Sequence, residues 1–221
     1  MKQYFIDLSR VLQPGVGETP GYPPTIIENF QIHKTHGRTN AKLSYNIHSG
    51  THVDVPFHFI EKGEKVDEMG LERFYGPGIY LDLHDKMKAN SPLSIVSLKR
   101  TLHENNLTEN QLREKVLILH SGWGKNWGKD NYYRDNPYLS PEVAHFFVAR
   151  KVKAVGLDFP VDGNLASIVH TIHLGGGVLH IENLTNLEAL KGIKRFNVIF
   201  FPYKIYKQSG APSRVVAQIF D

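Results

Sequence analysis

Three histidines and one aspartate gather within eleven residues of the segment SYNIHSGTHVDVPFHF, residues 44–59. An extended chain directs alternate side chains to one face, so four even-numbered residues would share a face there. Gly50, Pro56 and the β-branched residues oppose a helix in this segment. The four residues are His48, His52, Asp54 and His58. Imidazole and carboxylate groups of this spacing predict a metal site on a strand or extended loop, with a polar cluster or a pH-sensitive surface as the alternatives.

The composition limits the ligands and the partners. The chain of 221 residues contains no cysteine, so any metal must be held by imidazole and carboxylate groups. The net charge is +4, but the basic residues are dispersed, and we expect no nucleic-acid partner. No apolar run reaches the roughly 20 residues of a membrane span. Asp7 and Arg10 stand where a secretory peptide would stay apolar, so we expect a cytoplasmic location and no membrane partner.

Alternation and length predict which elements hold these residues. Strands are expected at residues 3–8, 25–34, 41–47, 78–83, 115–120, 153–157, 178–181, 197–203 and 214–220, with the third leading directly into the histidine cluster. Helices are expected at residues 94–105, 140–150 and 165–174, while residues 61–75 are ambiguous. Ser140 as N-cap and Pro141 at the first helical position mark the clearest boundary. The pattern indicates a single α/β domain, residues 1–221, with a mixed sheet.

Two long segments lack a regular pattern. Residues 13–24 hold four prolines and three glycines, and residues 123–139 are rich in glycine, asparagine, aspartate and aromatic residues. Loops of this length are uncommon in compact domains unless they line a site or cover an interface. We therefore expect the first loop to form a pocket wall, with a surface excursion as the alternative.

Several motifs resemble those of one enzyme family. The run HSGTHVDVPFHF resembles the HxGTHxDxPxHF motif of the cyclase family, which includes bacterial kynurenine formamidases and isatin hydrolases. A second family element, a histidine followed twelve residues later by the glutamate of an ENL tripeptide, is matched by His170 and Glu182. The stretch VGLDFPVDG, residues 155–163, and the opening FIDLS resemble two further family elements. These segments span most of the chain.

The resemblance implies a fold, a chemistry and roles for particular residues. Family members have a swivelling β/β/α architecture, form oligomers and bind one or two divalent metals, so the resemblance implies a homodimer or homotetramer that binds metal. Donors of imidazole and carboxylate without sulfur suit zinc or manganese. The positions that match the first metal's ligands are His48, His52 and Asp54, and those that match the second are Asp54, His170 and Glu182. His58 matches the catalytic acid/base. The implied activity is hydrolysis of a small amide C–N bond, as in an arylformamidase.

Some alternatives stay open on the residues alone. His173 and His180 share a face with His170 and Glu182 respectively, so either could replace His170 as a ligand. Asp158 and Asp162 suit hydrogen bonds to ligating histidines or a turn-forming role. The loop reading ETPGYPPT contains Tyr22 but lacks the tryptophan common in formylkynurenine-specific relatives. The alternative functions are therefore hydrolysis of a cyclic amide or lactone, and metal binding without catalysis.

Overall fold

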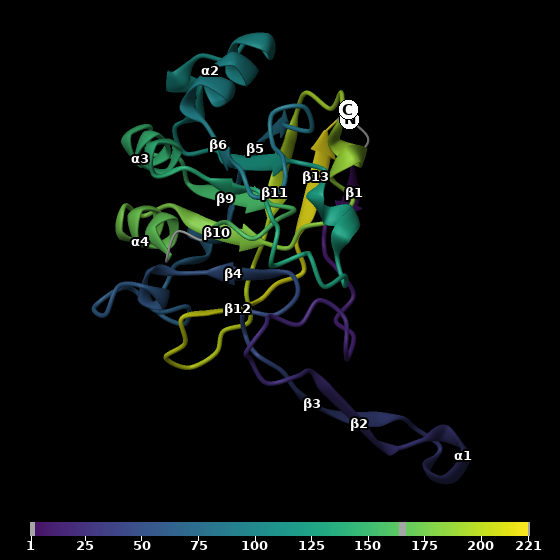
Figure 1. Ribbon diagram of the computed structural model, residues 1–221. Coiled ribbons are helices and arrows are strands. Elements are labelled where there is room, and N and C mark those ends of the chain that lie inside the picture. The colour runs from purple at the N-terminus through teal and green to yellow at the C-terminus, as the bar shows by residue number, and fades with distance from the viewer. Residues whose placement is uncertain (1–2, 164–166, 221) are drawn as a thin grey trace.

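A curled mixed sheet forms the centre of the structure (Figure 1). The computed structural model describes residues 3–163 and 167–220. Within this part of the chain the sheet has nine strands, in the order β1 (Gln3–Asp7), β13 (Val216–Phe220), β11 (Phe196–Ile199), β5 (Tyr75–Asp82), β7 (Val116–His120), β9 (Ala154–Leu157), β10 (Leu179–Glu182), β4 (His52–Asp54) and β12 (Gly210–Pro212). The sequence predicted all of the longer strands but missed β12.

Strand direction divides the sheet into a parallel centre and antiparallel flanks. Neighbours from β5 through β7 and β9 to β10 run parallel. The pairs β1–β13, β13–β11, β11–β5, β10–β4 and β4–β12 are antiparallel. All five residues of β7 are buried, as the continuous apolar run predicted for a strand covered on both faces.

Three helices cover one face of the sheet (Figure 1). They are α2 (Ile95–Glu104), α3 (Pro141–Ala149) and α4 (Ile168–Gly175). The predicted start of α3 is confirmed, because the Val143 amide donates to Ser140 Oγ over 3.2 Å. The predicted start of α4 at residue 165 lies outside the described residues, and its end coincides with the glycines at 175–177.

The remaining elements are short. Two small sheets pair β2 (Ile26–Gln31) with β3 (Asn40–Ser44) and β6 (Pro92–Leu93) with β8 (Tyr138–Leu139). One helical turn, α1 (His33–His36), joins β2 to β3. The 3-10 helices are η1 (Pro56–His58), η2 (Leu71–Phe74), η3 (Glu109–Leu112), η4 (Trp123–Asn126) and η5 (Leu187–Leu190).

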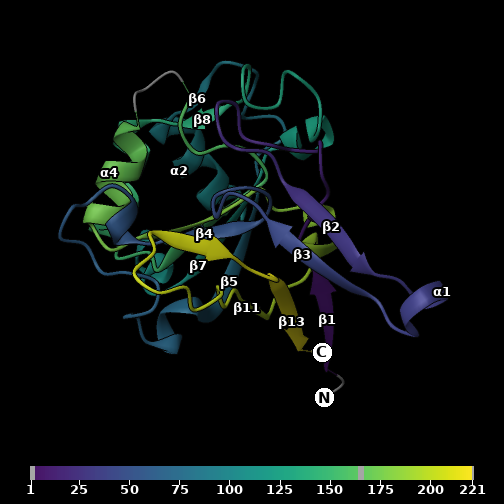
Figure 2. The same ribbon diagram turned by 90° about the horizontal axis from the view of Figure 1, so that it is seen from below.

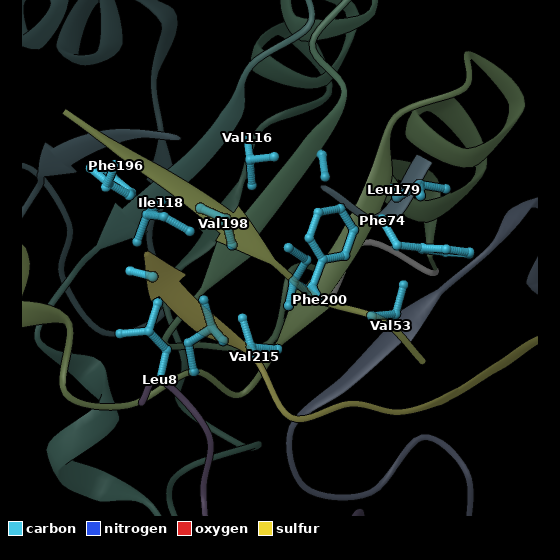
Figure 3. Close-up of a cluster of buried hydrophobic side chains, with 14 of the residues drawn as sticks. Leu8, Val53, Phe74, Val116, Ile118, Leu179, Phe196, Val198, Phe200 and Val215 are labelled. Atoms are coloured by element: carbon cyan, nitrogen blue, oxygen red, sulfur yellow. The ribbon is translucent and has the colours of Figure 1, made fainter. Parts of the chain in front are cut away.

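Two hydrophobic clusters lie on opposite faces of the sheet. One fills the inside of the curl and includes Leu8, Val53, Val116, Val198 and Phe200 (Figure 3). The other joins the helices to the outer face of the central strands and includes Leu98, Phe147, Leu117, Leu157 and Val169. A helical layer therefore lies on a sheet that packs against itself, which is the β/β/α arrangement expected.

An arm formed by β2, α1 and β3 projects from the body of the protein (Figures 1 and 2). Every residue of its strands except Gln31 is exposed. Ile27, Phe30 and Leu43 are among the large apolar side chains that it presents to solvent. A separate two-stranded hairpin is only marginally stable in water, so the arm gains little from its own contacts.

One expectation about the histidine segment is wrong. Strand β3 ends at Ser44, followed by a turn, and the next strand contains only residues 52–54 before η1 begins at Pro56. The segment is therefore not one extended run. Within the described ranges, we find no helix with the length and apolar character needed to cross a membrane.

Candidate metal centre

Two neighbouring strands supply four side chains to one face of the sheet. Strands β4 and β10 are antiparallel, with Asp54 opposite His180 and His52 opposite Glu182. Because side chains alternate along a strand, Val53 points into the inner core while its two neighbours point toward the helices. The shared face thus carries the carboxylates of Asp54 and Glu182 and the imidazoles of His52 and His180.

Helix α4 covers this face and adds a third imidazole. His170 Nε2 lies 3.6 Å from Asp54 Oδ2 and 3.7 Å from Glu182 Oε1. Its other ring nitrogen, Nδ1, lies 2.5 Å from Asp162 Oδ2. The Asp162 carboxylate therefore accepts the Nδ1 proton, so Nε2, which faces the two carboxylates, is the nitrogen that can bind an ion once it loses its proton.

His48 and His58 reach the same place from turns. His48 precedes β4, and its Nδ1 lies 2.6 Å from Asp54 Oδ1, while its Nε2 lies 2.8 Å from Ser209 Oγ. His58 ends η1, and its ring stacks on that of His48 with 3.9 Å between centroids. The six predicted site residues are thus brought together, although the predicted cause, a continuous extended chain, applies only to His52 and Asp54.

A hydrogen bond also determines which ring nitrogen of His52 faces Asp54. Its Nδ1 donates to the Gly50 carbonyl over 2.9 Å, so Nε2 is the nitrogen that carries the lone pair once the ring is neutral. That Nε2 lies 3.3 Å from Asp54 Oδ1. A ligating histidine commonly has its second nitrogen held in this way, and the arrangement suits metal binding.

Charge is concentrated around Asp54, which is almost completely buried. Burial opposes ionisation, but His52 and His48 outweigh it and hold the Asp54 pKa well below its usual range. Burial alone would lower the pKa of His52, yet the Asp54 carboxylate raises it to about 9. Burial opposes the charge on His170 as well, but the hydrogen bond to Asp162 and the nearby carboxylates of Asp54 and Glu182 raise that pKa to about 10. Two imidazolium groups therefore compensate the buried carboxylate when no ion is bound.

A divalent cation fits this cluster. Asp54 Oδ2 is buried and has no hydrogen-bond partner among the described residues. Two groups bring their donor atoms within 4.8 Å of one another, and Asp54 belongs to both: Asp54, His170, His180 and Glu182 form the first, and His48, Asp54 and His58 form the second. An ion would supply the positive charge that the two imidazolium groups provide, and the nitrogens of those groups would become ligands.

A cavity of about 180 Å³ opens onto the cluster. The walls include Thr19 and Tyr22 from the first long loop, Tyr133 from the second, and Phe59 after η1. The predicted role of residues 13–24 as a pocket wall is confirmed, because Thr19 and Tyr22 line the cavity.

Glu182 is held at the cavity by the backbone of the chain. Its Oε1 accepts a hydrogen bond from the Val161 amide, and burial raises the pKa of its carboxyl group.

The comparisons with known proteins agree with this geometry. The family model described as "Putative cyclase" matches residues 6–161. The chain belongs to this family. Among curated relatives, the kynurenine formamidases of Bacillus mycoides (strain KBAB4) and Bacillus cereus (strain ATCC 10987 / NRS 248) are 27% identical over 219 residues and 28% identical over 219 residues, and each alignment covers 96% of both chains.

Solved structures show the same fold as this cyclase-family chain. Isatin hydrolase A from Ralstonia solanacearum has a TM-score of 0.87 at 20% identity, with 99% of this chain and 92% of that chain covered. A potential metal-dependent hydrolase with cyclase activity has a TM-score of 0.75 at 17% identity, with both chains covered completely. The α/β prediction is therefore confirmed at the level of the fold.

The structure also separates residues that the sequence left undecided. Asp162 contacts a site histidine, whereas Asp158 accepts hydrogen bonds from Ser121 and Gly124 and lines a different cavity of about 810 Å³. Ser209 was missed, because a lone serine before a three-residue strand carries no sequence signal. Only the tertiary structure brings this hydroxyl group to His48.

We expect Asp162→Asn to weaken metal binding by about 10- to 100-fold, the usual cost of losing a partner behind a ligating histidine. The amide keeps an oxygen for the Val169 amide but loses the charge that orients His170. Competition with a coloured chelator measures the affinity. The matched control is Asp130→Asn at an exposed aspartate. Equal affinities for both variants would show that Asp162 does not orient His170.

Metal affinity is expected to rise with pH through the neutral range. His52 and His170 must lose protons to bind an ion, and their raised pKa values, about 9 and about 10, keep both rings protonated throughout that range. Displacing two protons makes the affinity change by up to about 100-fold per pH unit. Calorimetry in buffers of different ionisation enthalpy counts the protons released. Binding without proton release contradicts this charge assignment.

Proposed function

We propose that this protein is a metal-dependent hydrolase that cleaves the C–N bond of a small amide, with aryl formamides as the substrate class. The observation that carries the proposal is the convergence of two carboxylates and several imidazoles on Asp54 at a cavity of about 180 Å³. The names of the relatives, kynurenine formamidase and isatin hydrolase, support hydrolysis of a C–N bond outside peptides. The small cavity suits a small-molecule substrate.

The chain's own residues have separate tasks in this reaction. A divalent ion, when bound, polarises the substrate carbonyl and lowers the pKa of bound water. Asp54 and Glu182 supply the negative charge that retains the ion, and the histidines supply nitrogen ligands. Without cysteine these donors suit zinc or manganese, with one or two ions bound.

His58 moves the proton. Burial and the neighbouring histidines lower the pKa of His58 to about 4, so the ring is neutral near pH 7. A neutral imidazole accepts a proton from the attacking water and then donates it to the departing nitrogen. His58 is half-buried beside His48 at the cavity, where it can contact substrate. Tyr22, Tyr133 and Phe59 present aromatic surfaces to the acyl or aryl group.

Metal analysis combined with a substrate screen tests this function. The purified protein is loaded with zinc or manganese, its ion content is measured, and aryl formamides, cyclic imides and lactones are assayed with a chelator-treated control. Turnover of formamides that is lost on chelation and restored by metal supports the proposal. Turnover of lactones or cyclic amides alone changes the substrate class. Metal content without any turnover contradicts the hydrolase assignment.

We also propose that the protein assembles as a homodimer or homotetramer. The support is the projecting arm, whose large apolar side chains are exposed and whose two strands are marginally stable by themselves. Light scattering measures the assembled mass, and a species of only 25.1 kDa would contradict the proposal. A cytoplasmic location stays a prediction.

A further inference from the structure

His180 lies directly behind the proposed site, opposite Asp54 across the β4–β10 pair. Its side chain is completely buried and does not line the cavity. His180 Nδ1 and Asp54 Oδ2 are 3.9 Å apart, too far for a hydrogen bond, and neither atom has a hydrogen-bond partner among the described residues. Two buried polar atoms that face each other without partners are costly, and an atom bound to both would satisfy them.

The second nitrogen of His180 is held by another buried histidine. His180 Nε2 lies 2.7 Å from Nδ1 of His173, which α4 places one turn beyond His170. When His180 Nε2–H donates to His173, the lone pair of His180 remains on Nδ1 and faces Asp54. This is the arrangement found behind ligating histidines, where the nitrogen away from the metal donates to a neighbouring acceptor.

We propose that His180 is the fourth protein ligand of a closed metal site formed with Asp54, His170 and Glu182. The inference rests on the metal dependence in the proposed function. It extends the three-residue set that the family resemblance implies for the second ion. The four donor atoms lie within 4.8 Å of one another, and three of their separations are 3.6, 3.7 and 3.9 Å. Donors bound about 2.1 Å from a zinc ion in a tetrahedron are about 3.4 Å apart, so small movements complete the site.

The two ions would then differ in character. The closed site has four protein donors and leaves no position for water in tetrahedral coordination, as in structural zinc sites. The set of His48, His52 and Asp54 has three donors, which is the number that keeps one position open in catalytic zinc sites. The ion at the closed site is expected to bind first and to exchange slowly, and the open set next to His58 is expected to hold the exchangeable ion.

Cobalt binding tests this inference without measuring activity. Coordination geometry determines the visible spectrum of Co²⁺, and four-coordinate sites absorb much more strongly than six-coordinate ones. With one equivalent of Co²⁺, the wild-type protein should show the intense four-coordinate spectrum. His180→Leu, which keeps the volume but removes the nitrogen donor, should shift the positions and intensities of these bands, because a different set of atoms then holds the ion, and should bind the first ion more than about 100-fold more weakly. The matched control, His36→Leu on the exposed arm, should behave as the wild type does.

The alternative is that His180 lies beside Asp54 without binding the ion. In that case His180→Leu keeps the band positions and intensities of the wild type and loses affinity only within the roughly 10- to 100-fold range of residues behind a ligand, and the inference is wrong. If His180→Leu does not fold, anomalous diffraction from wild-type crystals loaded with zinc decides the question. A zinc ion about 2.0–2.1 Å from His180 Nδ1 supports the inference, and an ion beyond bonding distance overturns it.

These outcomes are separate from those of the proposed function. A protein that hydrolyses amides with two bound ions, neither of them on His180, keeps the function and loses this inference. A protein with the closed site but without turnover loses the function and keeps the inference.

Discussion

Asp54→Ala should remove metal binding and reduce kcat/KM by about 10³-fold or more. Asp54 is the residue shared by both donor groups, and its two oxygens face His48 and His52 on one side and His170 on the other. Its loss leaves positive charges in a buried site without compensation. A metal ion contributes several kcal/mol of transition-state stabilisation, and each 1.36 kcal/mol corresponds to about tenfold in rate.

Metal content after dialysis and steady-state kinetics measure the two effects. Asp85→Ala, at an exposed aspartate, is the matched control and should retain both metal and activity. Circular dichroism distinguishes metal loss from unfolding, and Asp54→Asn, which keeps the side-chain shape, should retain the fold if the alanine variant does not. Binding of two ions by Asp54→Ala with unchanged affinity would rule out the bridging role.

His58→Ala should keep its metal while kcat falls by about 10²- to 10⁴-fold, the usual contribution of general acid/base catalysis. The reason is the position of His58, which stacks on His48 at the cavity, while His48 contacts the Asp54 carboxylate. The loss should be larger for alkyl amide substrates than for activated aryl ones, because a poor leaving group depends more on protonation of its nitrogen.

His84→Ala provides the control, since this half-exposed histidine lies outside the cavity of about 180 Å³. His48, Asp54 and His58 also form a possible ligand group, so metal content must be measured together with the rate. Loss of metal in proportion to activity would make His58 a ligand. Full kcat on an unactivated amide would require another acid.

Local sequence patterns were sufficient to predict many of the helices and strands. The cap at Ser140 and Pro141 predicted the start of α3, and the continuous apolar run at 115–120 predicted the buried strand β7. Both signals act within one element, through hydrogen bonds to neighbouring amides or through burial of consecutive side chains. Strand β12 was missed because its three residues are too few for a pattern, although it pairs along the whole of β4.

The residue types of the site were predicted more accurately than the backbone segments that hold them. Spacing placed His52 and Asp54 on one face of a strand, and the resemblance to the cyclase family added His170 and Glu182. The turn that carries His48 back to Asp54 and the 3-10 helix that carries His58 have no period-two pattern. Side-chain alternation along a strand therefore places two of the four residues and not the other two.

The sequence by itself determined the available chemistry: imidazole and carboxylate donors without sulfur, two of them on one strand face, in a family of known motifs. Only the tertiary structure decided which residues contact these donor groups and orient them. It placed β10 beside β4, so that His180 faces Asp54, and it placed α4 so that His173 contacts His180. It also brought Asp162 and Ser209 to His170 and His48. The pairing of strands far apart in the chain depends on the packing of the whole sheet, and local periodicity contains no information about that register.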